Sequence, residues 1–287
     1  MVIQKITCTV KGQADLNAGY TGGTPIHHYA YTNMLHLKTK QTTGQNVAQK
    51  LLSEKRSDRT PASFDEYGAA RMDTTGDTLS FLMYNLSLPA NHEYQERVRM
   101  SLPELPPFGQ PLTLAEISQL LNNPYLNSVI KETLLIYPAI PVTLPRVVPH
   151  GGRVIDEFRL PAGTLASSSV YAVNQSLLQD FEKIPETDQW KPSRWLVESD
   201  ADKDEVQELE RRLWSFGSGG RGCIGKHLAI VEISLLLAAV LSRFWLRPAE
   251  NNPIAVTHEQ WTARRSFRDI AYMDGFGGIV RFEPLKQ

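Results

Sequence analysis

The 287-residue chain has only two cysteines, Cys8 and Cys223, and no tryptophan before Trp190. Two cysteines cannot form the disulfide framework of a small secreted domain, which favours a reducing compartment and a fold held by its core. The formal net charge of −1 leaves no basic footprint for nucleic acid or for an anionic membrane surface. We therefore expect no nucleic-acid partner.

Long apolar runs are also scarce. The longest, residues 228–241, is interrupted by Glu232 and is shorter than the roughly 20 residues that cross a bilayer, so we interpret it as a buried helix. Residues 1–10 are too short and too polar for a signal peptide or a membrane anchor. An apolar fraction of 41% is enough for a real core. The sequence as written predicts a globular, cytoplasmic protein.

The strongest functional signal is a glycine-rich loop, residues 216–225, that runs into an apolar segment beginning at Lys226. Cys223 is therefore expected at or just before a helix N-terminus, where unpaired N–H groups and the helix dipole favour a thiolate. The glycines allow the backbone to approach a flat ligand closely. The pattern predicts a metal-ligating cysteine beside a planar cofactor. The alternative is a structural cysteine buried after a glycine turn.

The loop resembles the haem-binding loop of the cytochrome P450 family, whose pattern is Phe-x-x-Gly-x-Arg-x-Cys-x-Gly. All five fixed positions are present, as Phe216, Gly219, Arg221, Cys223 and Gly225. The resemblance implies that Cys223 is the axial thiolate ligand of haem iron and that Arg221 pairs with a haem propionate. It also implies that Phe216 packs beside the sulfur and tunes it.

A helix is predicted from Ser63, as N-cap with Glu66 at the capping-box offset, to near Pro89. Residues 70–75 read Ala-Arg-Met-Asp-Thr-Thr and resemble the oxygen-binding segment of P450s. The resemblance implies that Asp73 and Thr74 are catalytic, relaying protons for cleavage of the O–O bond. The alternative is a threonine-rich helix with a solvated aspartate.

Arg71 departs from the family pattern at this segment, because P450s usually have a glycine there that leaves room for dioxygen. A guanidinium at this position is expected either to crowd the distal face or to pair with an acid or an anionic substrate group. Either outcome is expected to work against ordinary oxygen activation.

A second helical segment is predicted from Thr113 to about Tyr137, with an interruption at Pro124. Its end resembles the Glu-x-x-Arg motif of P450s, in which Glu132 is present and Leu135 replaces the arginine. The segment Trp190-Lys191-Pro192-Ser193-Arg194-Trp195 resembles the family's Phe-x-Pro-x-Arg-Trp. The resemblance implies a structural lock, formed here by Glu132 and Arg194 without its middle partner; otherwise Glu132 is a surface acid.

Between these motifs, residues 138–148 are rich in proline and β-branched residues, and the turns at 151–152 and 161–164 predict a small sheet. By resemblance this sheet lies beside haem, with Arg146 as a second propionate partner and residues 142–144 lining the substrate pocket. The alternative for Arg146 is a surface arginine on an edge strand.

The resemblance covers residues 63–287, whereas residues 1–62 form a poorly defined N-terminal segment. It implies a mainly α fold with small β-sheets, a P450-like fold truncated at its N-terminal side. Full-length relatives are often anchored to the endoplasmic reticulum, and no such anchor is expected in this chain.

The implied function is a haem-thiolate monooxygenase, an oxidoreductase that inserts oxygen from O2 into a small apolar substrate, as in secondary metabolism. Its electrons would come from NADPH through a P450 reductase partner. The alternative is a remnant without oxygenase activity, acting as an interaction or non-oxidative protein, which Arg71 and Leu135 favour.

Overall fold

The structure is a computed structural model. It describes residues 61–107, 110–141, 145–180, 189–200, 202–249 and 280–285, and at 61–73 and 177–180 it describes the backbone only. The chain divides into two units within its first described helix, between Thr74 and Thr75. The buried core belongs to the unit that contains Thr75–Gln287.

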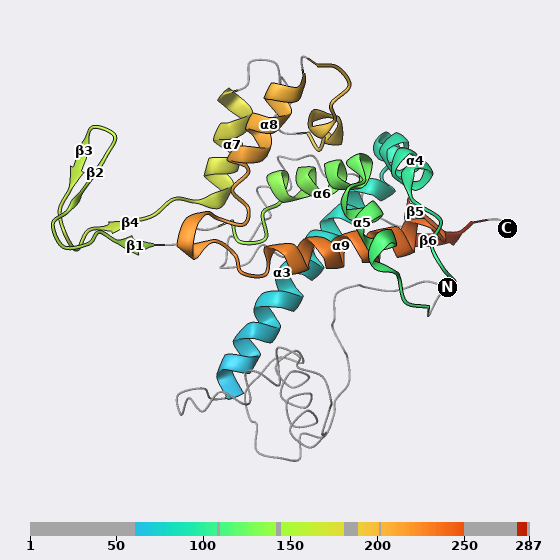
Figure 1. The fold of residues 1–287 in the computed structure, drawn as a ribbon, viewed down its shortest axis with the longest axis horizontal. Helices are drawn as coiled ribbons and strands as arrows, with labels where there is room; N and C mark the ends of the chain where they lie inside the picture. The colour runs from blue at the N-terminus through green and yellow to red at the C-terminus, as the bar shows by residue number, and fades with distance from the viewer. Residues whose placement is uncertain are drawn as a thin grey trace. The chain divides into compact units, whose positions relative to one another are not determined.

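Helices dominate the described part of the chain (Figure 1). The α-helices are α3 (Pro61–Ser87), α4 (His92–Ser101), α5 (Leu114–Leu121), α6 (Pro124–Ile136), α7 (Val170–Asp180), α8 (Asp202–Arg212) and α9 (Lys226–Leu241). Three short 3-10 helices are η1 (Pro89–Asn91), η2 (Pro192–Trp195) and η3 (Gly219–Arg221).

The six described strands form three two-stranded antiparallel sheets. Their bounds are β1 (Arg146–Val147), β2 (Arg153–Ile155), β3 (Phe158–Leu160), β4 (Leu165–Ala166), β5 (Phe244–Pro248) and β6 (Val280–Pro284). The pairs are β1 with β4, β2 with β3, and β5 with β6, the last in a register that places Leu246 opposite Phe282. The predicted class, mainly α with small sheets, is confirmed.

Local signals explain where α5 and α6 begin. Thr113 caps α5 in a capping box: its Oγ1 accepts from Glu116 N at 3.3 Å, and Glu116 Oε2 accepts from Thr113 N at 2.6 Å. Asn123 caps α6 by accepting from Leu126 N at 2.9 Å, and Pro124 occupies the first helical position. The predicted interruption at Pro124 is therefore the start of a new helix.

Two details of the predicted helices are wrong. The helix expected to follow Ser63 begins at Pro61, so Ser63 lies inside it and cannot be its N-cap; proline is well suited to a first turn because that turn needs no N–H partner. Residues 228–241 do form a helix, but Leu228 and Leu236 are 48% and 50% exposed. Only one face of α9 is buried.

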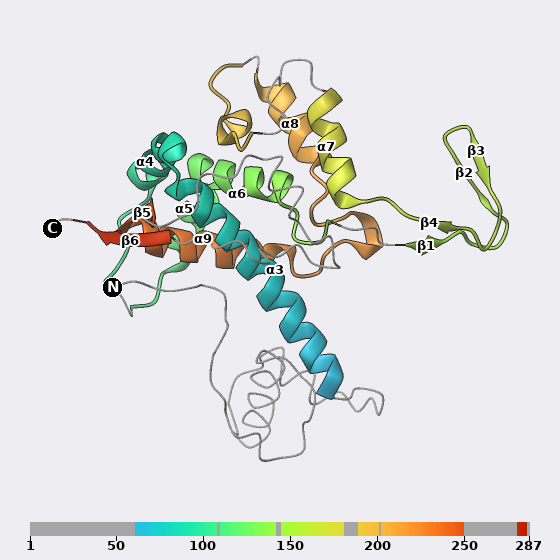
Figure 2. The same cartoon turned by 180° about the vertical axis from the view of Figure 1, so that it is seen from behind.

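The core lies where α6 and α9 run side by side and where α4, α5 and the second half of α3 pack against them (Figures 1 and 2). Leu135 and Ile136 of α6 and Leu237 and Leu241 of α9 are fully buried within it. Phe81 of α3 stacks on Tyr137 with ring centroids 4.8 Å apart. Residues far apart in sequence thus share one apolar cluster, which supports both α6 and the loop that leads into α9.

Candidate functional site

The loop that carries Cys223 closes on itself just before α9. Cys223 N donates to Phe216 O at 2.8 Å, and Gly222 N donates to Gly219 O at 3.1 Å. Gly217 and Gly219 have φ values of 64° and 63°, in the left-handed region that residues with a Cβ enter only at a cost. The glycines are thus needed for the turns that bring the two ends of the loop together.

Cys223 lies three residues before the first residue of α9 and its side chain is exposed. Lys226 N donates to Cys223 O at 3.4 Å, which joins the cysteine to the first turn of the helix. A structural cysteine buried after a glycine turn, the alternative for this residue, is wrong. The sulfur is open to a ligand beside a helix N-terminus, where the helix dipole favours an anion.

The surroundings of Cys223 fit a flat, partly apolar ligand. Ile224 is 97% exposed and Leu228, one turn into α9, is 48% exposed, so apolar surface flanks the thiol. Phe216 packs partly buried against the core, and Lys226 Nζ lies 5.9 Å from its ring centroid. Arg221 is exposed and supplies a cationic group suited to an anionic substituent. The groups available to such a ligand are one thiol, one guanidinium and an apolar surface.

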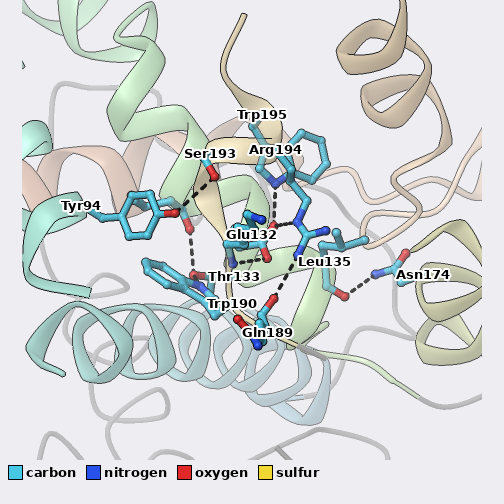
Figure 3. A network of polar contacts seen from close by, with 12 residues as sticks. Tyr94, Glu132, Thr133, Leu135, Asn174, Gln189, Trp190, Ser193, Arg194 and Trp195 are labelled. Atoms are coloured by element: carbon cyan, nitrogen blue, oxygen red, sulfur yellow. Dashed lines mark hydrogen bonds and ion pairs between the residues drawn. The ribbon is translucent and has the colours of Figure 1, made fainter. Parts of the chain in front are cut away.

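Glu132 forms the second centre: its carboxylate accepts two hydrogen bonds and forms an ion pair with Arg194 (Figure 3). Lys191 N donates to Oε1 at 2.7 Å, Trp195 Nε1 donates to Oε2 at 2.8 Å, and Arg194 Nε lies 2.9 Å from Oε2. Glu132 is fully buried and the Arg194 side chain is 4% exposed. The structure brings together the two residues of the proposed structural lock, so Glu132 is not a surface acid.

The burial of Glu132 has an electrostatic consequence. Loss of hydration raises the pKa of its carboxyl group above the ordinary value, while the attraction of Arg194 and the hydrogen bonds from Lys191 and Trp195 oppose that rise. Because the pKa stays raised, the cost of burying this carboxylate is only partly offset. We therefore expect that a second cation beside Glu132 would stabilise the fold.

Leu135 follows Glu132 by three residues on α6 and is fully buried. It belongs to the apolar core cluster. Residues three apart on a helix share one face, so position 135 is where an additional guanidinium would approach the carboxylate. The described structure instead has apolar packing at this point.

Trp190 and Trp195 were not predicted to have roles. Besides the contact of Trp195 with Glu132, Trp190 Nε1 donates to Thr133 Oγ1 at 3.0 Å, and Thr133 Oγ1 donates to Val129 O at 2.8 Å. Tyr94 packs edge-on against Trp190, with ring centroids 5.8 Å apart. The Trp-Lys-Pro-Ser-Arg-Trp segment therefore clamps α6 through both of its tryptophans as well as its arginine.

The remaining predicted residues are less completely described. The side chains of Arg71 and Asp73 and all of residues 142–144 lie outside the described part of the chain. Thr74 is partly buried, but it and Cys223 belong to different units, so proton delivery by Asp73 and Thr74 stays a prediction. Arg146 is exposed on β1, where its Nη1 donates to Pro145 O at 3.0 Å.

Comparison with known proteins identifies the arrangement. The sequence model of the family described as Cytochrome P450 matches residues 26–266, a range that includes the Glu132 centre and the Cys223 loop. The chain belongs to the cytochrome P450 family. Haem is the cofactor that this family implies, and the exposed thiol beside a helix N-terminus fits it as an axial ligand.

Several named P450 monooxygenases resemble the chain. A cytochrome P450 monooxygenase of Aspergillus hancockii is 35% identical over 63% of this chain and 33% of its own length. One of Penicillium brevicompactum is 33% identical over 61% of this chain and 20% of its own. The mitochondrial sterol 26-hydroxylase of Rattus norvegicus is 31% identical over 64% of this chain and 33% of its own. The chain thus spans a third or less of each of these relatives.

Two features are absent from the described residues. They hold no cluster of three or more histidine, cysteine or acidic side chains that could bind a metal ion. None of their helices combines the length and the apolar character that a bilayer crossing requires.

Proposed function

We propose that this protein acts in a haem-thiolate monooxygenase reaction that inserts an oxygen atom from O2 into a small apolar organic substrate. The observation that carries the proposal is the exposed Cys223 thiol in a closed loop, directly before the N-terminus of α9. The relatives that are named as monooxygenases support it. The substrate and a role in secondary metabolism belong to the proposal.

Each residue of the Cys223 loop has a separate task in this proposal. Cys223 would bind the iron as thiolate, and Arg221 would hold a propionate. Gly219 and Gly225, which have no Cβ, would let the neighbouring backbone approach the haem closely. Arg146, exposed on β1, would hold the second propionate. Bound haem supplies the redox chemistry that activates dioxygen.

The protein's own residues would control protons and electrons around that chemistry. Asp73 would accept and pass on protons at its carboxylate, and Thr74 would orient water through its hydroxyl. Electrons would come from NADPH through a reductase partner. The Glu132–Arg194 pair lies within the protein and would act by holding α6 and η2 together, without touching substrate.

Isotope incorporation tests the reaction. The purified protein, supplied with haem, a P450 reductase and NADPH under 18O2, should convert small apolar test substrates to products that carry one heavy oxygen atom. The double variant Asp73→Asn/Thr74→Ala should form no labelled product, although it should still bind haem. Haem binding without labelled product from any substrate would support a non-oxygenating protein instead.

Arg71 favours that second candidate function, a haem-binding or interaction protein without oxygenase activity. The Arg71→Gly variant separates the two, because it restores the family's small residue while leaving the Cys223 loop intact. Labelled product in Arg71→Gly alone would mean that the native chain is the non-oxygenating form.

A further inference from the structure

A buried asparagine on α7 ties the start of the cysteine loop to the end of α6. Asn174 is fully buried, and its Nδ2 donates to Leu134 O at 3.3 Å, Leu135 O at 3.2 Å and Ser215 Oγ at 2.9 Å. Its Oδ1 accepts from Trp214 N at 3.3 Å. Both ends of one amide are therefore used between three segments, and Figure 3 shows its contact with Leu135.

The carbonyl groups that Asn174 binds are ones that α6 cannot satisfy by itself. The last four carbonyls of a helix lack intrahelical partners, and Leu134 and Leu135 lie in the last turn of α6, which ends at Ile136. Ser215 Oγ also donates to Leu134 O, at 2.7 Å. Buried acceptors of this kind are costly when unpaired, so the Asn174 amide and the Ser215 hydroxyl are held firmly in place.

The contacts of Asn174 with Trp214 and Ser215 lie next to the hydrogen bond that holds Cys223. Trp214 and Ser215 directly precede Phe216, whose carbonyl accepts the Cys223 amide at 2.8 Å. A shift of Trp214 and Ser215 would move this carbonyl and loosen the hydrogen bond that closes the loop.

We propose that Asn174 is a positioning residue for Cys223, acting through Trp214, Ser215 and Phe216. The importance of this role for catalysis rests on the proposed haem-thiolate function. The structural role itself does not, because the loop closes through protein contacts alone.

Gln95 on α4 provides a matched control. It is also a fully buried amide that donates to two carbonyls, Leu86 O at 2.8 Å and Leu246 O at 3.1 Å, and accepts from Leu246 N at 2.7 Å. None of these three contacts involves the cysteine loop. Asn174→Asp and Gln95→Glu make the same isosteric change, since each turns an amide donor into a carboxyl that faces two carbonyl oxygens.

Hydrogen exchange of the full chain without haem measures the outcome. Relative to global unfolding of the same variant, Asn174→Asp should speed exchange of the Cys223 amide by about tenfold or more, and Gln95→Glu should leave that ratio at the wild-type value. Ser215→Ala, which removes a single hydroxyl, should give a smaller increase in the same amide and covers the case in which Asn174→Asp does not fold. Two results would overturn the proposal. One is a relative exchange rate of the Cys223 amide that is the same in Ser215→Ala as in the wild type. The other is a relative exchange rate that is the same in Asn174→Asp as in Gln95→Glu.

A spectroscopic readout connects this role to haem. In reduced, carbon monoxide-bound protein, Asn174→Asp should shift absorbance from the thiolate-type Soret band to the ordinary haem band, whereas Gln95→Glu should not. A wild-type protein that shows no haem absorbance would refute the proposed function. It would leave the exchange measurement to decide the role of Asn174.

Discussion

Replacing Arg194 by methionine tests the structural lock most sharply. The change removes the guanidinium but keeps a flexible apolar stem, and it leaves the fully buried Glu132 carboxylate with the Lys191 and Trp195 donors only. Two unit charges about 4 Å apart attract by about 4 kcal/mol at an effective dielectric constant near 20. Breaking a buried pair from one side costs about 3–5 kcal/mol, and we expect a loss in this range.

The assay is urea denaturation at neutral pH, with Arg97→Met as the control. Arg97 Nη2 lies 2.6 Å from Glu93 Oε1, but the two side chains are 41% and 70% exposed. An exposed pair of this kind contributes at most about 1 kcal/mol. The two variants remove the same group from ion pairs of similar length, so the difference between their losses measures the effect of burial.

The pH dependence gives the second half of this prediction. Without Arg194 the pKa of Glu132 rises further above its ordinary value of 4.5, and the fold then favours the protonated acid. Stability held by a protonated group is lost as pH rises through the raised folded-state pKa and is regained as pH falls. The deficit of Arg194→Met should therefore shrink from neutral pH toward about pH 5, and adding Glu132→Gln should restore part of it at neutral pH. A loss no larger than that of Arg97→Met, or one independent of pH, would refute the reasoning.

Two further predictions concern the same helix. Leu135→Arg should raise the unfolding free energy by about 1 kcal/mol, because the stabilisation from a charge-assisted hydrogen bond to Glu132 exceeds the packing energy that is lost. Leu135→Met, the control, should give no gain. Thermal melting checks both variants, and a lower melting temperature for Leu135→Arg than for the wild type would contradict this expectation. Thr133→Val should lower the unfolding free energy by about 1–3 kcal/mol, because it leaves the buried Trp190 N–H unpaired. The same substitution made in a Trp190→Phe protein should cause no such loss. A loss of the same size in that background would show that this hydrogen bond is not the cause.

The sequence carried enough information for the features that depend on local pattern. The start of α9 after the glycine loop, the break at Pro124 and the mainly α class follow from capping, proline and periodicity. The helix α8 was not predicted, although Asp202 and Asp204 in its first turn and Arg211 and Arg212 in its last turn complement the helix dipole. That charge pattern was the available signal.

Other features depend on tertiary contacts that no local pattern contains. The two donors that join Arg194 at Glu132 are a backbone N–H and an indole N–H, and either could have faced solvent as far as the sequence shows. The same holds for Asn174, whose amide binds Leu135 and Trp214, which lie 39 positions before it and 40 positions after it. Exposure of Leu228 and Leu236 was missed because an apolar run does not reveal which of its faces is covered.

We propose that Cys223 is the thiolate ligand of haem iron, and one spectrum tests this assignment directly. The protein is supplied with haem, reduced and exposed to carbon monoxide, alongside Cys223→Ser. The wild-type protein should show the far-shifted Soret band of a thiolate-ligated haem, and the variant should lose that band. An absence of haem absorbance in the wild type, or a shifted band that survives Cys223→Ser, would contradict the assignment.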